Sequence, residues 1–386
     1  MIAALRLLTA VVVFLGSLLA VFSAPTYNLW QASIAVTELG FVLALLALVV
    51  LLPGWHRSLI GRAAAMLALA AVVLAVSPIV RAYGVARDLP ARLTTAFGAA
   101  TPHSLDGAPA LERPFTLGGM LRGAPTPAVV TTRAEQYTSR AGKPLELDLY
   151  AKAGAVAATP LIVMIHGGSW RGGDRSDLAP LNSYLAARGY VVAAISYRFA
   201  PHNPHPAATD DVNSAIEYLK ANGPRFGLDR TRIALIGRSA GGQLALLSAY
   251  TKNDPAIRGV VGLYPPSDQV FGYENPSNPR VINSTLILED YLQGNPKTAP
   301  AAYASSSPIN FVGPATVPTL LIHGRKDELV FARQSARLTA RLASAGRPHL
   351  YLELPWATHG CDYFFNGPCG QLSTYAIERF LAAVMR

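Results

Sequence analysis

Charge is scarce in this 386-residue sequence: Asp, Glu, Lys and Arg make up 15% of it, whereas 51% of the residues are hydrophobic. The shortage is concentrated near the N-terminus. No charged residue occurs between Arg6 and Glu38, between Glu38 and Arg57, or between Arg62 and Arg81. Because soluble globular domains usually carry about 25% charged residues, this N-terminal part is not typical of one.

Motifs for metal and nucleotide binding are also missing. The two cysteines, with no H-x-H or H-E-x-x-H pattern beside them, are too few ligands for a metal site. There is no G-x-x-x-x-G-K-[ST] phosphate loop and no stretch with the spacing of a dinucleotide fingerprint. The net charge of +10 is scattered rather than clustered with aromatics, which favours attraction to anionic lipid headgroups over nucleic acid. We therefore expect no metal, no cofactor and no nucleic-acid partner.

Three mostly apolar segments are each long enough to cross a bilayer, which requires about 20 mostly apolar residues. They cover residues 4–24, 33–52 and 61–80. The sequence therefore predicts a transmembrane anchor over residues 1–82. A cleaved signal peptide at 1–24 is the alternative, although its basic region is weak and its apolar run is long. Glu38 lies inside the second segment near its end, and the sequence gives it no role.

Three spans would place the C-terminal part of the chain on the opposite side of the membrane from the N-terminus. Arginines flank the segments equally on both sides, so the positive-inside rule does not decide the orientation. Cys361 and Cys369 are close enough in sequence to pair, and disulfides persist in oxidising compartments. We therefore expect an integral protein of a bacterial-type cell membrane with an extracytoplasmic C-terminal domain.

Two further regions follow the apolar segments. Residues 83–128 are rich in proline and glycine, which predicts a linker with a short interfacial helix near 84–98. Residues 129–386 alternate apolar runs with helical periods. Strands are expected at 160–166, 190–197, 232–237, 259–264, 319–323 and 350–354, and helices at 207–222, 240–251 and 331–345.

This alternation predicts an α/β fold with a doubly wound, mostly parallel sheet covered by helices on both faces. Most of the expected strands are unbroken apolar runs, as strands buried on both faces should be. In such sheets, sites lie beyond the carboxyl ends of the strands.

A glycine-flanked serine follows the expected strand 232–237. Gly237, Ser239 and Gly241 fit G-x-S-x-G between a strand and a helix, the setting in which this motif exposes a nucleophile. A turn sharp enough to present the serine leaves no room for side chains at 237 and 241. The motif alone is also compatible with an ordinary tight turn, so other residues have to decide.

A serine hydroxyl is a weak nucleophile that needs a base, and the base needs an orienting carboxylate. Three histidines follow Ser239 along the chain. His323 ends an expected strand and should be packed or hydrogen-bonded there, and His349 opens a strand on the far edge. His359 lies in a loop just after strand 350–354, which makes it the candidate base.

The carboxylate is expected in the loop after strand 319–323, where Asp327 and Glu328 lie. Asp327 comes first out of the turn and is the candidate. Glu328 is expected to be solvated or to cap the following helix. Asp362 and Asp268 are weaker candidates.

An oxyanion formed during attack on a carbonyl needs backbone N–H donors, and the loss of one typically costs about 3–4 kcal/mol. The stretch H-G-G-S-W begins with His166 and Gly167 at the end of strand 160–166, where such a loop belongs. Its small residues let the backbone approach a substrate. The expected donors are the N–H groups of Gly168, Ser169 and Ala240.

Taken together, these stretches resemble the α/β-hydrolase esterases of the hormone-sensitive-lipase-like and feruloyl-esterase/deacetylase-like groups, related to the prolyl-oligopeptidase hydrolases. The resemblance spans about 145–386. Its motifs are H-G-G-S-W, Y-R-F-A-P-H-N-P-H-P-A-A-T-D-D-V (197–212), G-R-S-A-G-G, H-G-R-K-D-E-L-V (323–330) and T-H-G-C-D-Y-F-F-N-G-P-C-G-Q (358–371).

The resemblance implies that Ser239 is the nucleophile, His359 the general base and Asp327 its orienting partner. Asp210 and Asp211 match the family and are expected to fix neighbouring loops. Ser169 departs from the pattern, because glycine is common at that oxyanion position.

Two features near the expected site stay open. Cys361 and Cys369 would brace the His359 loop as a disulfide and would be passive packing as free thiols. The long segment 267–312 is rich in Pro, Asn and Tyr and is expected to be a cap-like insertion over an acyl pocket.

The sequence thus predicts a membrane-anchored serine hydrolase whose domain 129–386 cleaves a small-molecule or lipid carboxylic ester. An acyltransferase or peptidase with the same triad is the alternative, and a non-catalytic membrane scaffold is a more distant one.

Overall fold

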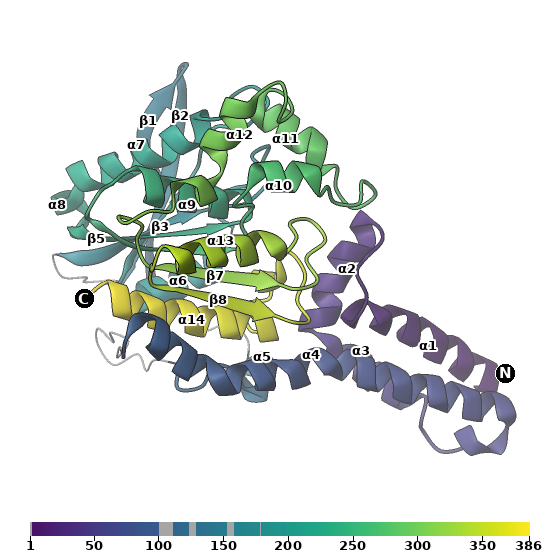
Figure 1. Cartoon of the computed structure of the whole chain (residues 1–386). Helices are drawn as coiled ribbons and strands as arrows, with labels where there is room; N and C mark the ends of the chain where they lie inside the picture. The colour runs from purple at the N-terminus through teal and green to yellow at the C-terminus, as the bar shows by residue number, and fades with distance from the viewer. Residues whose placement is uncertain (1, 100–110, 123–128, 153–157, 178) are drawn as a thin grey trace.

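The computed structural model describes residues 2–99, 111–122, 129–152, 158–177 and 179–386. Within these ranges eight strands form one sheet in the order β1-β2-β4-β3-β5-β6-β7-β8 (Figure 1). Neighbours from β4 to β8 run parallel, whereas β2 pairs antiparallel with both β1 and β4. The strands are β1 (Val129–Arg140), β2 (Lys143–Lys152), β3 (Thr159–Ile165), β4 (Val191–Ile195), β5 (Leu228–Arg238), β6 (Ile257–Leu263), β7 (Thr319–Gly324) and β8 (His349–Leu354).

Helices cover both faces of the sheet, so the predicted doubly wound α/β fold is confirmed. One face carries α7 (Ala207–Ala221), α9 (Ala240–Thr251) and α13 (Arg333–Ser344). The other carries α6 (Ala179–Ala187), α14 (Pro368–Val384) and the second half of α4 (Leu59–Phe97). Short α8 (Gly223–Phe226) follows α7, and α5 (Leu117–Arg122) follows α4.

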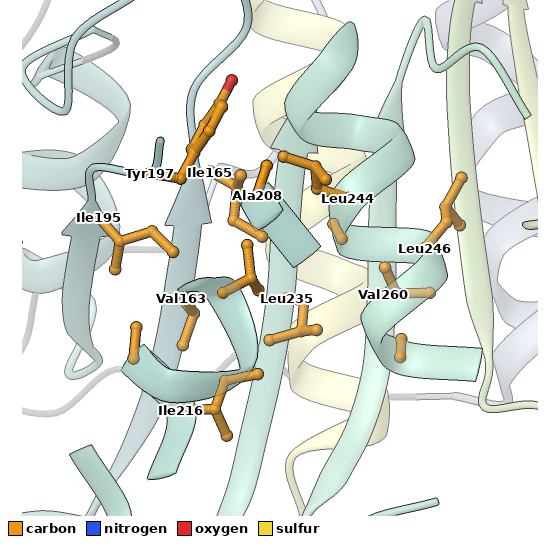
Figure 2. Close-up of a cluster of buried hydrophobic side chains, with 14 of the residues drawn as sticks. Val163, Ile165, Ile195, Tyr197, Ala208, Ile216, Leu235, Leu244, Leu246 and Val260 are labelled. Carbon is orange, nitrogen blue, oxygen red and sulfur yellow. The ribbon is translucent and has the colours of Figure 1, made fainter. Parts of the chain in front are cut away.

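The six expected strands could be predicted from the sequence because most of them are buried in the core on both faces of the sheet. Figure 2 shows Val163, Leu235 and Val260 from three parallel strands packed with Ile216 of α7 and Leu244 of α9. Every residue of β3, β4 and β7 is buried, which requires unbroken apolar runs.

The hairpin of β1 and β2 was not expected as strands. β1 is largely exposed or half-buried along its length, and polar residues such as Thr131, Thr132 and Gln136 occupy it. It therefore lacks the apolar run that marks an inner strand.

The expected cap-like segment 267–312 forms three short helices near the carboxyl ends of the strands. They are α10 (Gln269–Glu274), α11 (Ser284–Leu292) and α12 (Pro300–Ser306). Ile287, Tyr291 and Tyr303 join them to the core beside α9. The segment is thus a packed part of the domain rather than a detached lobe.

The N-terminal region projects from the sheet as a narrow bundle with the N-terminus at its far end (Figure 1). It consists of α1 (Ile2–Ser17, followed by a 3-10 turn), α3 (Gly40–Val49) and the first half of α4. Two described helical segments, Ile2–Ala20 and Leu59–Phe97, are long and apolar enough to cross a membrane, or three if the bent pair α2 (Tyr27–Glu38) and α3 counts as one.

Two boundaries differ from the sequence expectation. The expected second span at 33–52 is broken at Leu39, because α2 and α3 meet there at 82° and α2 lies against the sheet domain. The expected boundary at residue 82 falls inside α4, which continues through Pro78 and Pro90 to Phe97. Its second half buries Ala82, Leu89 and Leu93 in the core beneath the sheet.

Candidate active site

Ser239 stands on a strained turn between β5 and α9. Its φ of 51° and ψ of −121° lie in a region that L-residues rarely adopt. A Cβ at Gly237 would lie 2.0 Å from the carbonyl oxygen of Gly241, and one at Gly241 would lie 2.2 Å from that of His166. Both positions therefore require glycine, as expected for a G-x-S-x-G turn that is sharp enough to expose its serine.

Three side chains from three separate loops meet here. The Nε2 atom of His359 lies 2.9 Å from Oγ of Ser239, and its Nδ1 atom lies 2.6 Å from Oδ2 of Asp327. The loop after β8 carries His359, and the loop after β7 carries Asp327. The structure thus brings together Ser239, Asp327 and His359, the three residues predicted from the sequence.

Asp327 is held as an ionised acceptor. Its Oδ1 accepts the N–H groups of Leu329 (2.9 Å) and Val330 (2.8 Å), and its Oδ2 also lies 3.2 Å from Nε2 of His323. Burial alone would raise the pKa of Asp327, but the neighbouring His359 and His323 outweigh it and lower the pKa to about 2. His323 is therefore buried and hydrogen-bonded, as expected, and it helps to hold Asp327.

The expected oxyanion donors lie in the loop after β3, which carries Gly168 and Ser169, and at the start of α9, which carries Ala240. Gly168 has a φ of +115°, and a Cβ there would lie 2.0 Å from the carbonyl oxygen of Gly172, so glycine is required. Ser169 follows with a φ of 55°, and Ala240 begins α9, where the first N–H groups have no partner within the helix. Gly167, Gly168 and Ser169 line the same cavity wall as Ser239 and His359.

Trp170 ties this loop to the cap segment. Its indole N–H donates to Oε1 of Gln243 on α9 (3.0 Å), and its ring stacks on Tyr291 of α11 at 4.1 Å. Gln243 in turn donates to the carbonyl of Ser306. Gln243 was not among the predicted residues, although its position four residues after Ser239 on a buried helix was a usable signal.

The loop that carries His359 is braced twice. Cys361 and Cys369 form a disulfide, which closes one of the alternatives left open by the sequence. Asp362 accepts from Arg238 (3.0 Å) and from the hydroxyl of Tyr264 (2.6 Å), all of them buried. Asp362 therefore anchors the loop to the residue before Ser239, and it does not contact the histidine as a triad carboxylate would.

Asp268 and Asp211 also have structural positions. Asp268 caps the N-terminus of α10 and pairs with Arg337 (2.7 Å). Asp211 is fully buried and receives both the backbone N–H and the guanidinium of Arg198, which fixes the loop after β4.

The expectation for Glu328 was wrong. Its carboxylate is buried rather than solvated, and it does not cap α13. It accepts the backbone N–H of Ala24 (2.8 Å) and the hydroxyl of Thr358. A sequence gives no sign of such a partner, because Ala24 lies 304 residues away in the N-terminal region.

Glu328→Gln is expected to stabilise the protein increasingly as the pH rises. Burial raises the pKa of Glu328, and the charge of Asp327 adds to this. The folded state therefore binds this proton more tightly than the unfolded state, and stability falls as the pH rises above the ordinary carboxyl pKa toward the folded one. Glutamine does not ionise, so melting curves in detergent between pH 4 and 8 should show the variant gaining Tm on the wild type. A difference in Tm that stays constant with pH would contradict this account.

An apolar cavity opens beside Ser239 under the cap segment. It encloses about 630 Å³ of empty space, part of it open to solvent. Ser239, Ser169, Ala240 and His359 line it, and polar side chains of Gln269, Asn275, Ser277, Ser284 and Gln334 also contribute. Most of the remaining lining consists of apolar side chains from the cap segment and from the loop after β7. These include Phe271, Ile282, Ile287, Leu288, Val330 and Phe331.

The chain is similar to known esterases. The BD-FAE family profile matches residues 147–342. Esterase LipC of Mycobacterium tuberculosis is 35% identical over 242 residues, which cover 59% of each chain. The probable carboxylic ester hydrolase LipM of the same organism is 30% identical over 63% of this chain and 59% of its own. The chain thus spans about three-fifths of the length of these relatives.

Solved structures share the fold. A bacterial heroin esterase superposes with a TM-score of 0.59 at 20% identity, covering 70% of this chain and 89% of its own. At that identity the likeness concerns the architecture of the domain.

Proposed function

Since the chain belongs to the BD-FAE family and has the α/β-hydrolase fold, we propose that it is a membrane-anchored serine carboxylesterase. The observation that carries the proposal is the unbroken chain of contacts from Ser239 through His359 to Asp327 at the end of an apolar cavity. The names of the esterase relatives support the same reaction class.

The reaction proceeds through an acyl-enzyme. Oγ of Ser239 attacks the ester carbonyl while Nε2 of His359 takes the hydroxyl proton. The N–H groups of Gly168, Ser169 and Ala240 stabilise the tetrahedral oxyanion. His359 then gives the proton to the departing alcohol, and water, activated by the same nitrogen, releases the acid. Asp327 holds the imidazole in the required tautomer throughout.

The apolar cavity is the proposed acyl site. Apolar side chains predominate in its lining, among them Phe271, Ile287 and Phe331, and they suit a hydrocarbon chain. The segment 267–312 supplies much of this wall, so it is the part of the chain that we expect to set acyl preference.

The N-terminal bundle is the proposed membrane anchor. Small residues form its interior: Ala10, Ala47, Ala64, Ala68 and Ala71 are buried at the helix contacts. Large apolar side chains point outward instead, including Leu5, Leu8, Leu45, Leu46, Met66, Leu69 and Val73. Small residues inside and large ones outside are the pattern of helices packed in lipid. The 19 residues of Ile2–Ala20 span about 28 Å, close to the hydrocarbon thickness of a bilayer.

The catalytic domain is proposed to face the extracytoplasmic side. The disulfide between Cys361 and Cys369 supports this, because such bonds are rare where thiols are kept reduced.

One experiment tests the reaction and the anchor together. Membranes from cells producing the full chain are extracted with detergent, and the purified protein is assayed with p-nitrophenyl butyrate and treated with a fluorophosphonate probe. We expect hydrolysis in the membrane fraction and probe attached to the peptide that contains Ser239. A protein that hydrolyses no ester and leaves Ser239 unlabelled would refute the proposed chemistry, and activity recovered in the soluble fraction would refute the anchor.

A further inference from the structure

Helix α2 lies beside the active site although the sequence places it within an apolar, membrane-type region. It does not continue the bundle of α1, α3 and α4, but turns at Leu39 and runs toward the loops at the carboxyl ends of the strands (Figure 1). Tyr27 is 47% exposed and Trp30 is half-buried at its start, whereas Glu38 is fully buried at its end.

The loop that carries His359 and the first turn of α14 after it contact α2 at three points. The indole N–H of Trp30 donates to the carbonyl of His359 (3.3 Å). Ile34 lies against Gly360, where its Cδ1 is 3.6 Å from the position of an added Cβ. The carboxylate of Glu38 accepts the N–H of Cys369 (2.8 Å) at the start of α14. The sequence assigns no role to Glu38, but in the structure this residue joins the anchor to the catalytic domain.

Two other loops of the site contact the residues just before α2 and its first turn. The backbone N–H of Tyr27 donates to the carbonyl of Arg280 in the cap segment (3.0 Å), and the side-chain amide of Asn278 in the same segment donates to the carbonyl of Pro25 (3.2 Å). Ala24 donates to Glu328, next to Asp327. The segment is thus bonded to the cap, to the Asp327 loop and to the His359 loop.

These contacts enclose a second cavity at Ser239. It holds about 760 Å³ of empty space, part of it open to solvent, and α2 contributes Tyr27 and Trp30 to its wall. It shares five residues with the acyl cavity: Ser169, Ser239, Ile282, Leu329 and His359. A carbonyl carbon bound at Ser239 would therefore lie where the two cavities adjoin, so that the acyl and alcohol parts of an ester could occupy different cavities.

The two cavities differ in chemistry. The second one has four aromatic rings in its wall, those of Tyr27, Trp30, Tyr264 and Tyr363, together with the charged side chains of Asp177 and Arg238 and groups of the oxyanion loop. The rings of Tyr27 and Trp30 lie 5.2 Å apart, and the bond from Trp30 to His359 fixes the indole plane beside the catalytic base. Such a wall suits a flat or ring-bearing group better than a flexible chain.

We propose that the second cavity is the alcohol site and that α2, contributed by the N-terminal anchor region, selects esters of ring-bearing alcohols through Trp30 and Tyr27. This inference rests on the proposed esterase function. It makes α2 part of the substrate site rather than a spacer between the membrane and the enzyme.

The test compares two esters that differ only in the alcohol, benzyl butyrate and ethyl butyrate. Their hydrolysis by the full chain in detergent is measured by pH-stat titration of the acid released. Benzyl alcohol and ethanol have similar acidity, so the ratio of kcat/KM for the two esters reports the alcohol site rather than leaving-group reactivity. We expect the wild type to prefer the benzyl ester, and Trp30→Ala to lower that ratio about threefold to tenfold. Tyr27→Ala should lower it in the same direction, and its exposed side chain leaves folding intact.

A reciprocal variant separates the two sites. Of the two cavities, Ile287 lines only the acyl cavity, so Ile287→Ala should change the preference between ethyl acetate and ethyl hexanoate while leaving the benzyl-to-ethyl ratio unchanged. Trp30→Phe keeps a ring in the wall but loses the N–H bond to His359, so it should retain more of the benzyl preference than Trp30→Ala.

Two results would overturn the inference. Wild-type protein without any preference for the benzyl ester would do so, as would α2 variants that lower kcat/KM for both esters by the same factor. Failure of the proposed function has a different signature, namely that the wild type hydrolyses neither ester.

Discussion

Ser239→Ala is expected to lower kcat for ester hydrolysis about 10⁵- to 10⁶-fold with little change in KM, as in other triads that lose the nucleophile. The methyl group cannot form an acyl-enzyme, and His359 loses the hydroxyl that lies 2.9 Å from its Nε2. The cavities and the expected oxyanion donors stay in place, because alanine can occupy the same turn. Release of p-nitrophenol measured at high enzyme concentration, together with loss of fluorophosphonate labelling, checks this prediction.

The same helix provides the control. Ser248 is buried on α9, and its hydroxyl has no hydrogen-bond partner among the described residues. Ser248→Ala should therefore keep both the activity and the fold. If Ser239→Ala retained more than about one hundredth of the wild-type kcat, another group would have to be the nucleophile, and the triad would be the wrong description of the site.

The residues of the triad could be predicted because each depends on local sequence. A buried parallel strand is an apolar run, and the residues after it lie at the edge where such sheets carry their sites. Ser239 is also flanked by Gly237 and Gly241, which the turn requires. His359 and Asp327 each follow a strand that the sequence predicts. The side chains that meet in space were therefore found one loop at a time, without any knowledge of how the loops pack.

The position of α2 could not be predicted in this way. Residues 33–52 are uncharged apart from Glu38, so hydropathy treats them as one span. The bend at Leu39 depends on tertiary contacts: Gly40 packs so closely on α4 that an added Cβ would lie 2.1 Å from the carbonyl oxygen of Ala75. Glu38 is buried against α14, which begins 330 residues later in the chain. Periodicity and composition contain no record of such a contact.

The extent of α4 was hidden for a different reason. The stretch from residue 83 onward predicts a linker because it loses the apolar runs and gains prolines, beginning with Pro90, and proline disfavours helix interiors. The helix persists because its second half buries Leu89 and Leu93 against α14 and the sheet. Tertiary burial outweighs local propensity here, and it makes the connection between the N-terminal bundle and the sheet domain a continuous helix.

Asp327→Asn is expected to lower kcat about 10⁴-fold, since an amide at this position holds the catalytic histidine in the wrong tautomer. The N–H groups of Leu329 and Val330 both point at Oδ1 of Asp327, and only the oxygen of an asparagine can accept them. Its NH₂ group would then face Nδ1 of His359. That nitrogen would have to accept, the ring proton would move to Nε2, and Nε2 could no longer take the proton of Ser239. Steady-state assays with p-nitrophenyl butyrate would show the loss in kcat. KM should be retained, because Asp327 is buried and lines neither cavity.

Neighbouring carboxylates make the prediction specific to Asp327. Glu328→Gln is the same change one residue along the chain, and it should keep kcat within a few-fold because Glu328 contacts Ala24 and Thr358 but not the histidine ring. Asp362→Asn should weaken the bonds to Arg238 and Tyr264 and reduce kcat far less than Asp327→Asn. Since the pKa of Asp327 is about 2, the wild-type carboxylate stays ionised at any pH suited to the assay, so acid cannot mimic the variant there. A loss of less than tenfold in Asp327→Asn, or an equal loss in Asp362→Asn, would mean that the carboxylate orienting His359 is not the one that the geometry indicates.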